Sequence, residues 1–377
     1  MKQIFWIFLA IIASACVSNL FAKSQAVTSP DIGSIVKVLK DQKIDYYLFS
    51  NTQNNKFLVV PKFGGRILAV DLGGENVFWT HPDILRGQGG QRSWISPEGG
   101  AKGFILRPDW KGNRDFSMLD PGHYKVLDFK NNEYLSLANT FQVTSNDGQE
   151  NYYLTLTREM KLGQGPLLEE PQFKSLKYQF LGIDFVHKLK NNSQKKLDKI
   201  LALWSLIQVP PRGTMIVPVE EVVREAWRGN YFEPIPDEYV KANPDSFSFY
   251  VEGSRRYKVG LRPQSIKGII SYLARAKDND FFMIIMTFPV KPEAPYVDRP
   301  RTEQQTNGDC IQIYSHLEEA PLAFGEMECH SWGLELPPGS EQAFPIKIYI
   351  YKASLEILKK IGSRLVCPHF DKACLFK

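Results

Sequence analysis

Two short segments, far apart in the chain, carry side chains that could bind a ligand or transfer protons. The first is the glycine-rich run at 89–100, which contains Arg92, Trp94 and Glu98. A cation, a flat ring face and a carboxylate suit a sugar, because sugar hydroxyls form hydrogen bonds while the sugar's C–H face stacks on an aromatic ring. The same residues also fit a structural role, in which Trp94 anchors the loop and Arg92 pairs with Glu98. Residue types alone leave both interpretations open.

The second segment is residues 326–332, which read EMECHSW. In a strand, alternate side chains share a face, so Glu326, Glu328 and His330 point the same way, together with Trp332. Two carboxylates and an imidazole in a row suit acid–base catalysis if that face lines a cleft. The alternative is a solvated strand face with no chemical role.

Strands must position both segments, because strand signals dominate the chain after residue 44. Stretches rich in β-branched and aromatic residues, such as KFLVV, GRILAVDL and FFMIIMTF, are separated by short runs of Gly, Asn, Asp or Pro. This pattern favours a large antiparallel sandwich over alternating strands and helices. No polar linker divides residues 45–352. We therefore expect an all-β fold with one sandwich domain over residues 45–352.

Helices are expected only beside this sandwich. The N-terminal extension at 23–44 contains a helical apolar pattern over residues 29–41, with Ser29 as its cap. The C-terminal part at 353–377 begins with a helix over residues 354–364 and ends in a cysteine-containing tail. The predicted fold is thus a sandwich with short flanking helices.

Composition limits the classes of partner. The chain has 377 residues, of which 43% are hydrophobic and 23% charged, which is too much apolar material for a disordered protein. The formal net charge of +5 comes from scattered residues and not from a basic stripe. Nucleic acid is therefore not an expected partner.

The first 22 residues have the layout of an export signal. Lys2 precedes an apolar run and then small residues, and the run is too short to span a bilayer as a mature helix. Ala-Ser-Ala-Cys16 resembles a bacterial lipobox, in which Cys16 would be lipidated; the alternative is ordinary cleavage near Ala22 or Ala26. Both routes predict an exported protein, either periplasmic or an outer-membrane lipoprotein. A lipid on Cys16 would be its sole contact with the membrane.

Both routes leave four cysteines, Cys310, Cys329, Cys367 and Cys374. In an oxidising compartment, Cys367 and Cys374 are the expected disulfide, since they bracket a short loop. A zinc site with His369 lacks a fourth nearby ligand, so we expect no metal, and no cofactor motif is present.

Four segments of this sequence occur in the same order in a bacterial family of unknown function. They are GGRIL at 64–68, GGQRSWISPEGG at 89–100, the stretch from NNSQ to PPRG at 191–213, and MECHSWGLELPPGSEQ at 327–342. That family resembles the aldose 1-epimerases, or galactose mutarotases, whose fold is a β-supersandwich. The resemblance covers about residues 45–352 and implies the same fold, with a sugar as ligand.

The resemblance also implies roles for single residues. Glu328 takes the place of the mutarotase base, whereas Trp204 falls about where those enzymes carry their general-acid histidine. Trp204 has no titratable proton, so it cannot replace that acid, although a sugar could stack on it. His123 or His330 could supply a proton only from a new direction.

Three functions are therefore weighed. The first is an exported carbohydrate-binding or carbohydrate-processing protein in which Arg92, Trp94 and Trp204 bind sugar, with His123 as a further contact. The second is an acid–base enzyme, epimerase-like or lyase-like, that uses Glu328 with Glu98 or His330. The third is a structural envelope protein. The sequence does not indicate which sugar is bound or the oligomeric state. The first two functions require the two segments to face one groove.

Overall fold

The computed structural model describes residues 29–109, 111–220, 227–303, 305–316, 318 and 321–373. The predicted leader at 1–22, with Cys16, lies outside the described residues, and so does Cys374 of the expected disulfide.

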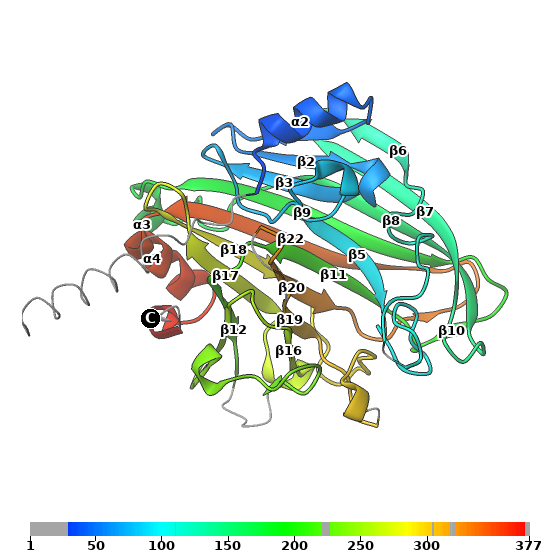
Figure 1. The fold of residues 1–377 in the computed structure, drawn as a ribbon. Helices are drawn as coiled ribbons and strands as arrows, with labels where there is room; N and C mark the ends of the chain where they lie inside the picture. Colours follow the sequence, from blue (N-terminus) through cyan, green and yellow to red (C-terminus); the bar gives the residue numbers. More distant parts are fainter. Residues whose placement is uncertain are drawn as a thin grey trace, which may run out of the picture.

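Two large antiparallel sheets form the body of the protein (Figure 1). The first has the strand order β1-β2-β3-β5-β11-β20-β19-β16-β13, with β4 paired to β3. Its strands are β1 (Tyr47–Ser50), β2 (Lys56–Val60), β3 (Arg66–Leu72), β4 (Glu75–Asn76), β5 (Gln91–Ser96), β11 (Ala202–Val209), β13 (Trp227–Arg228), β16 (Tyr257–Leu261), β19 (Ile311–Ser315) and β20 (Gly325–His330).

The second sheet has the order β14-β15-β12-β17-β18-β22-β9-β8-β7-β6. Its strands are β6 (Lys125–Lys130), β7 (Tyr134–Thr144), β8 (Asn151–Gly163), β9 (Gln179–Asn191), β12 (Gly213–Pro218), β14 (Val240–Asn243), β15 (Ser246–Val251), β17 (Ile269–Arg275), β18 (Phe281–Thr287) and β22 (Glu341–Ala353). A small separate pair joins β10 (Leu197–Asp198) to β21 (Glu335–Leu336). The predicted all-β sandwich is confirmed.

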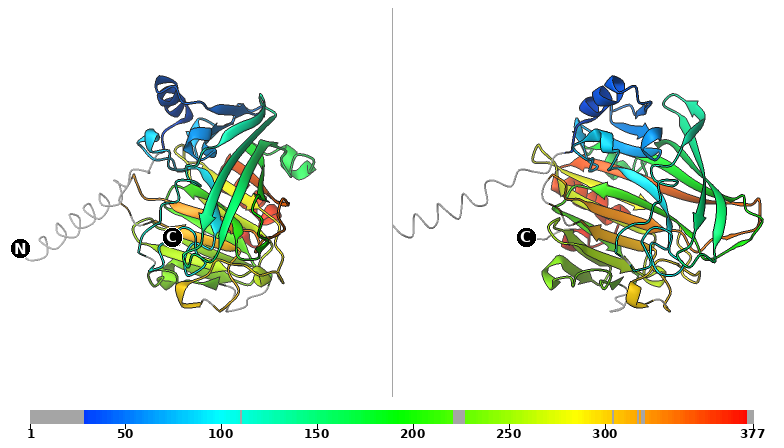
Figure 2. Two further views of the ribbon diagram at one scale, coloured as in Figure 1. Left: turned by 90° about the vertical axis from the view of Figure 1, so that its right-hand side faces the viewer. Right: turned by 45° about the vertical axis from the view of Figure 1, so that its right-hand side comes forward.

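The helices lie outside the sheets, and Figure 2 shows α2 in blue well separated from the C-terminal helices in red. They are α2 (Ile32–Asp41), α3 (Pro171–Lys174), α4 (Leu355–Leu365) and α5 (Phe370–Ala373), with 3₁₀ turns at Pro61–Phe63, Ile84–Arg86, Asp237–Tyr239, Pro263–Ser265 and Arg301–Glu303. Within the described part of the chain, none of these helices has the length and hydrophobicity needed to cross a bilayer.

Both flanking helices occur where the sequence predicts them, but the N-terminal cap differs. Asp31 caps α2 by accepting a hydrogen bond from the Ser34 N–H at 2.9 Å. The expected cap, Ser29, instead accepts a hydrogen bond from the Thr80 N–H at 3.1 Å, so its hydroxyl joins the helix start to the loop before β5. The prediction of Ser29 as the cap was therefore wrong.

Strand β20 shows how the core and the polar face share one strand. Cys329 lies 3.9 Å from Met286 of β18, so that side of β20 faces the second sheet and the apolar core. Glu326, Glu328 and His330 point to the opposite side, as the alternation predicts, yet all three are buried. The solvated-face alternative is therefore wrong. Among the described residues, Cys310 and Cys329 are free, buried thiols.

Candidate functional site

Antiparallel pairing aligns the alternate residues of five neighbouring strands, β5, β11, β20, β19 and β16, into rows across one face. Each row runs perpendicular to the strands, so residues from distant segments become neighbours. The rows contain Trp94, Trp204 and His330; then Arg92, Leu206, Glu328 and Gln312; then Gln208, Glu326, Tyr314 and Lys258.

A pocket of about 760 Å³ lies over this face. Five side chains that the sequence singled out line it, namely Arg92, Trp94, Glu98, Trp204 and Glu326. The rest of its lining includes basic, acidic and aromatic groups from loops and from β3, β16 and β19: Lys62, Arg66, Trp79, Arg86, Phe116, Asp120, Phe232, Arg256, Lys258, Tyr314, His316, Glu318 and Phe324. The two predicted segments thus meet in one pocket.

Arg92 is held from two sides. Its guanidinium carbon lies 3.9 Å from the centroid of the Trp94 ring, and its Nη2 donates to Glu326 Oε1 at 2.7 Å. Gln208 Nε2 donates to the same Glu326 oxygen at 3.0 Å. The structural alternative, in which Arg92 pairs with Glu98, is therefore wrong in its partner, because Arg92 donates to Glu326 of the neighbouring row.

Asp120 ties a loop to this part of the pocket. It accepts hydrogen bonds from Arg66 Nη2 at 2.6 and 2.8 Å and from Trp94 Nε1 at 2.6 Å. Burial alone would raise the pKa of Asp120, but the Arg66 and Arg92 cations outweigh it and lower that pKa. Asp120 is therefore an ionised anchor that fixes the Trp94 ring. Nothing in the sequence around Asp120 indicates this role, because the DPGH segment has the composition of an ordinary turn.

Lys258 is the central cation of the pocket floor. Its Nζ lies 3.3 Å from Glu98 Oε2, 3.3 Å from Glu328 Oε2 and 4.9 Å from the centroid of the Trp204 ring. Burial disfavours the ammonium, but Glu328 and then Glu98 outweigh this and raise the pKa of Lys258 above its ordinary value. Both predicted catalytic carboxylates thus contact one lysine. Lys258 was not predicted as a site residue. The one signal in the sequence is its position in a strand between Tyr257 and Val259, where alternation puts it on the opposite face from these two side chains.

Glu328 does not face the groove as expected. It is 0% exposed and does not line the pocket, and Glu326, two residues earlier, is the carboxylate of β20 that does. Burial raises the pKa of Glu328 well above its ordinary value, while the Lys258 cation limits the rise. The expectation that Glu328 lines the groove is therefore wrong: Glu328 is buried against the Lys258 ammonium, and Lys258 is the one of the two that reaches the pocket lining.

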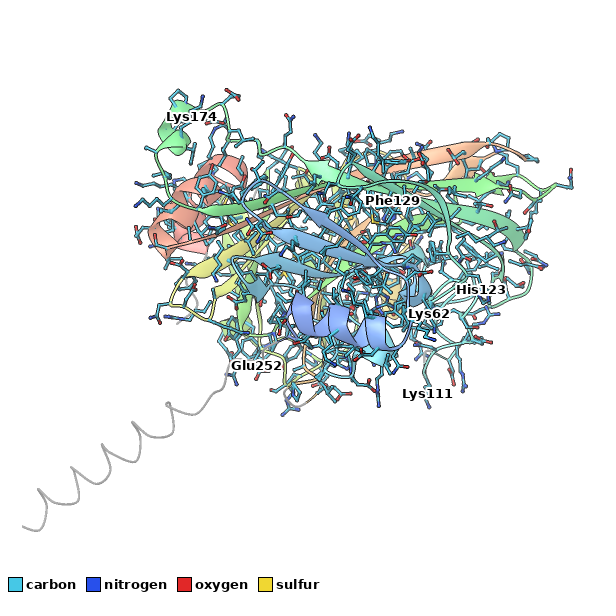
Figure 3. All side chains as sticks on the ribbon, turned by 90° about the horizontal axis from the view of Figure 1, so that it is seen from above. Lys62, Lys111, His123, Phe129, Lys174 and Glu252 are labelled. Carbon is cyan, nitrogen blue, oxygen red and sulfur yellow. The ribbon has the colours of Figure 1, made fainter. Side chains whose placement is uncertain are left out.

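The two predicted histidines also lie outside the pocket lining. His330 is 1% exposed, stacks on Trp204 with centroids 5.1 Å apart, and has its Nδ1 3.2 Å from Ser96 Oγ. Burial, and then the Lys258 cation, lower the pKa of His330 well below its ordinary value, so the ring is neutral at pH 7. His123 lies at the exposed surface (Figure 3), where the turn after Asp120 carries it away from the pocket.

Comparison with known protein families places residues 32–370 in a family described as "Family of unknown function (DUF6786)". The chain belongs to this family. The prediction of a family of unknown function is thereby confirmed. A comparison with curated proteins finds no match.

Several solved structures are similar to this family member. A proposed aldose 1-epimerase from Escherichia coli K12 has a TM-score of 0.48 at 12% identity, over 81% of this chain and 99% of the other. A second, from Klebsiella pneumoniae, has a TM-score of 0.44 at 10% identity, over 89% and 90%. Galactose 1-epimerase from Lactobacillus acidophilus has a TM-score of 0.36 at 8% identity, over 82% and 98%.

In this DUF6786 member, a second carboxylate positions the Glu98 loop. Asp298 Oδ1 accepts a hydrogen bond from the Glu98 N–H at 2.6 Å, and Asp298 Oδ2 accepts one from Gln312 Nε2 at 2.6 Å. Asp298 is 2% exposed, so both bonds are shielded from water. Asp298 thereby holds the loop that carries Glu98 against the strand face beside Lys258.

Several polar atoms at the floor still have hydrogen-bonding capacity. Within the described residues, Trp204 Nε1, Arg92 Nε and Gln208 Oε1 are buried and have no hydrogen-bond partner. Together with the ring faces of Trp94 and Trp204, they offer donors and acceptors beside flat apolar surfaces. The arrangement can thus hold a polyhydroxylated ring by hydrogen bonds and stacking. Among the described residues, no cluster of His, Cys, Asp or Glu side chains could hold a metal ion.

Proposed function

We propose that this protein binds a carbohydrate in the pocket over β5, β11, β20, β19 and β16. The observation that carries the proposal is the pairing of aromatic rings with charged groups at the pocket floor. Trp94 packs edge-to-face on both Trp204 and Phe116, with centroids 5.2 Å apart in each case. The Arg92–Glu326 and Lys258–Glu98 pairs border these rings, so stacking and charge-assisted hydrogen bonds act on the same ligand.

A binding role fits the floor better than mutarotation does. Trp204 has no titratable proton, and Glu328, the residue in the place of the mutarotase base, is buried against Lys258. His330 is neutral and outside the pocket lining, so it does not supply the missing acid. The resemblance to epimerases therefore extends to a sugar as ligand more readily than to their reaction.

One observation favours an acid–base enzyme as a second candidate. Glu98 and Glu328 contact the same ammonium, and burial raises the pKa of Glu328, so one carboxylate of the pair can hold a proton at neutral pH. An epimerase-like or lyase-like reaction would need such a proton-sharing pair. Glu98 would then be the group that touches the substrate.

The direct test is a ligand screen with mono- and oligosaccharides, by thermal shift and then calorimetry. Glu98→Gln should weaken sugar binding by about 1.5–3 kcal/mol, the cost of losing a hydrogen bond to a charged group. The matched control is Glu133→Gln, which removes an exposed carboxylate paired with Lys130 and distant from the pocket lining. This control should bind like the wild type.

Two outcomes would decide against parts of the proposal. If no saccharide in the screen raises the melting temperature, carbohydrate binding is refuted. If the bound sugar is also converted, as followed by NMR of its anomeric protons, and Glu328→Gln stops the conversion while binding persists, the enzyme replaces the binding protein as the function.

A further inference from the structure

The charges of the pocket are distributed unevenly between its floor and its mouth. Each buried cation of the floor has a carboxylate of the pocket within ion-pair distance. These pairs are Arg66–Asp120 at 2.6 Å, Arg92–Glu326 at 2.7 Å and Lys258–Glu98 at 3.3 Å. The floor is thus close to electrically balanced, which suits hydroxyl groups and not an extra charge.

The mouth carries an excess of positive charge centred on Arg256. This residue lies two positions before Lys258, so it extends the same face outward, where its side chain is exposed. Its guanidinium carbon lies 3.8 Å from the centroid of the Phe232 ring. Among the described residues, no carboxylate lies within ion-pair distance of Arg256. Stacking on Phe232 orients the guanidinium, one side of which reaches the Tyr314 hydroxyl, and the N–H groups not used there can bind an anion.

A planar platform lies beside Arg256. His316 stacks on Phe324 with ring centroids 4.4 Å apart and an interplanar angle of 15°, and Phe324 in turn packs on Trp79 at 4.6 Å. All three rings line the pocket. This platform is separate from the Trp94 and Trp204 rings of the floor. The pocket lining therefore contains two aromatic clusters, one at the floor and one beside His316.

One opposing charge lies at the mouth. Glu318 Oε1 is 3.7 Å from His316 Nε2, and its side chain is 45% exposed. Among the described residues, the pocket lining contains six Lys and Arg side chains and four carboxylates, so positive charge remains in excess.

We infer that the ligand is an acidic oligosaccharide, with a neutral ring at the floor and a ring bearing an anionic group at the mouth beside Arg256. This inference rests on the proposed function and names its substrate class. A carboxylate of a hexuronate and a sulfate ester share the chemistry that a guanidinium recognises, since both present two oxygens in one plane.

The test compares matched trisaccharides by calorimetry at low salt: a neutral one, one with a terminal hexuronate and one with a terminal sulfate ester. The wild type should bind at least one anionic trisaccharide about tenfold more tightly than the neutral one, as for one charge-assisted contact. Arg256→Gln should remove this preference while the affinity for the neutral trisaccharide stays within about twofold. The uronate and sulfate arms identify which anion is preferred.

Arg255→Gln is the matched control, because Arg255 is adjacent, exposed and paired with Glu233 at 3.9 Å, outside the pocket lining. It should keep the preference. Equal affinity of the wild type for the neutral and both anionic trisaccharides would overturn the inference and leave the proposed function intact. An equal loss of preference in Arg255→Gln would overturn the assignment to Arg256. No binding of any trisaccharide would instead refute the proposed function.

Discussion

The ammonium of Lys258 balances two carboxylates that would otherwise be costly to bury. Glu328 is fully buried and Glu98 is half-buried at the pocket, and each lies 3.3 Å from the same nitrogen. A charge without a partner in such a site costs several kcal/mol, whereas a paired one is close to neutral in its effect. Lys258 thus has a structural role in addition to its place in the pocket.

We expect Lys258→Met to destabilise the protein by about 3–5 kcal/mol at pH 9, because Glu328, which is ionised above its pKa of about 8, would lose its counter-charge while remaining buried. Urea denaturation at pH 9 measures the free energy of unfolding. The double variant Lys258→Met with Glu328→Gln should recover most of the loss, since no buried charge is then left unpaired. A double variant no more stable than Lys258→Met alone would contradict this account.

The contribution of Glu328 to stability should depend on pH. Burial raises the pKa of Glu328 from 4.5 to about 8, so the folded state holds its proton more firmly than the unfolded state does. In this window the folded state binds more protons, and the contribution is present below pH 4.5 and lost as pH rises toward 8.

The variant Glu328→Gln isolates the pH-dependent contribution of Glu328 to the free energy of unfolding, because glutamine does not titrate. From about pH 5 to 8, the free energy of unfolding of the wild type should fall relative to that of Glu328→Gln. The slope should be no steeper than about 1.4 kcal/mol per pH unit. Urea denaturation across this range measures it. A difference that stays constant, or that favours the wild type with rising pH, would show that Glu328 is ionised throughout.

At the scale of strands, the sequence predicted the side-chain alternation within a strand of the site correctly. It did not predict how the strands pair with one another. Alternation placed Glu326, Glu328 and His330 on one face of β20, and the structure has them there. Which of them reaches the pocket depends on the register with β11 and on where Trp204 packs. Neither the register nor the packing of Trp204 can be predicted from the sequence alone, because register is set by contacts between strands that are far apart in the chain.

Lys258 and Asp120 illustrate the same limit. Each looks ordinary within its own segment, and only the neighbouring strands give it a role. The rows that put Lys258 beside Tyr314 and Glu326 join β16, β19 and β20, whose order in the sheet is not their order in the chain. Site residues such as Lys258 and Asp120 are therefore identified from the contacts between strands and loops in the structure, and not from a sequence motif.

The loop before Glu98 depends on one buried carboxylate from another loop. Asp298→Ala should destabilise the protein by about 1–3 kcal/mol, because the Glu98 N–H and Gln312 Nε2 lose their acceptor in a buried place. It should also speed amide hydrogen exchange at residues 96–100 and weaken sugar binding. The control Asp198→Ala removes an exposed carboxylate and should leave all three measurements unchanged.

For the whole molecule, composition and strand spacing were sufficient to predict two facing β-sheets with helices at the flanks. Composition and strand spacing did not predict the strand order, in which β5 pairs with β11 and not with β6, and β22 lies between β18 and β9. Such long-range pairs depend on the total apolar area buried between the sheets. Local patterns carry no information about that area.

We propose that the protein is exported and that its leader is removed. Two routes give different products. Lipidation predicts that metabolic labelling with palmitate marks the protein and that Cys16→Ser abolishes the label; simple secretion predicts no label and a mature N-terminus between residues 20 and 27. Mass spectrometry of the purified protein locates that N-terminus. An intact N-terminal Met1 in the cell envelope would contradict both routes.

The alternation of β20 and its neighbours has a consequence for how this family can evolve. Met327 and Cys329 face the apolar core, whereas Glu326 and Glu328 between them face the pocket side. Pocket-facing and core-facing positions thus alternate along the same strands, although a pocket-facing residue such as Lys258 also contributes to stability. A substitution at a mouth residue such as Arg256 can change specificity without touching the core. Two descendants could therefore bind different glycans on an unchanged scaffold, and a library confined to the pocket-facing positions is the natural starting point for redesign.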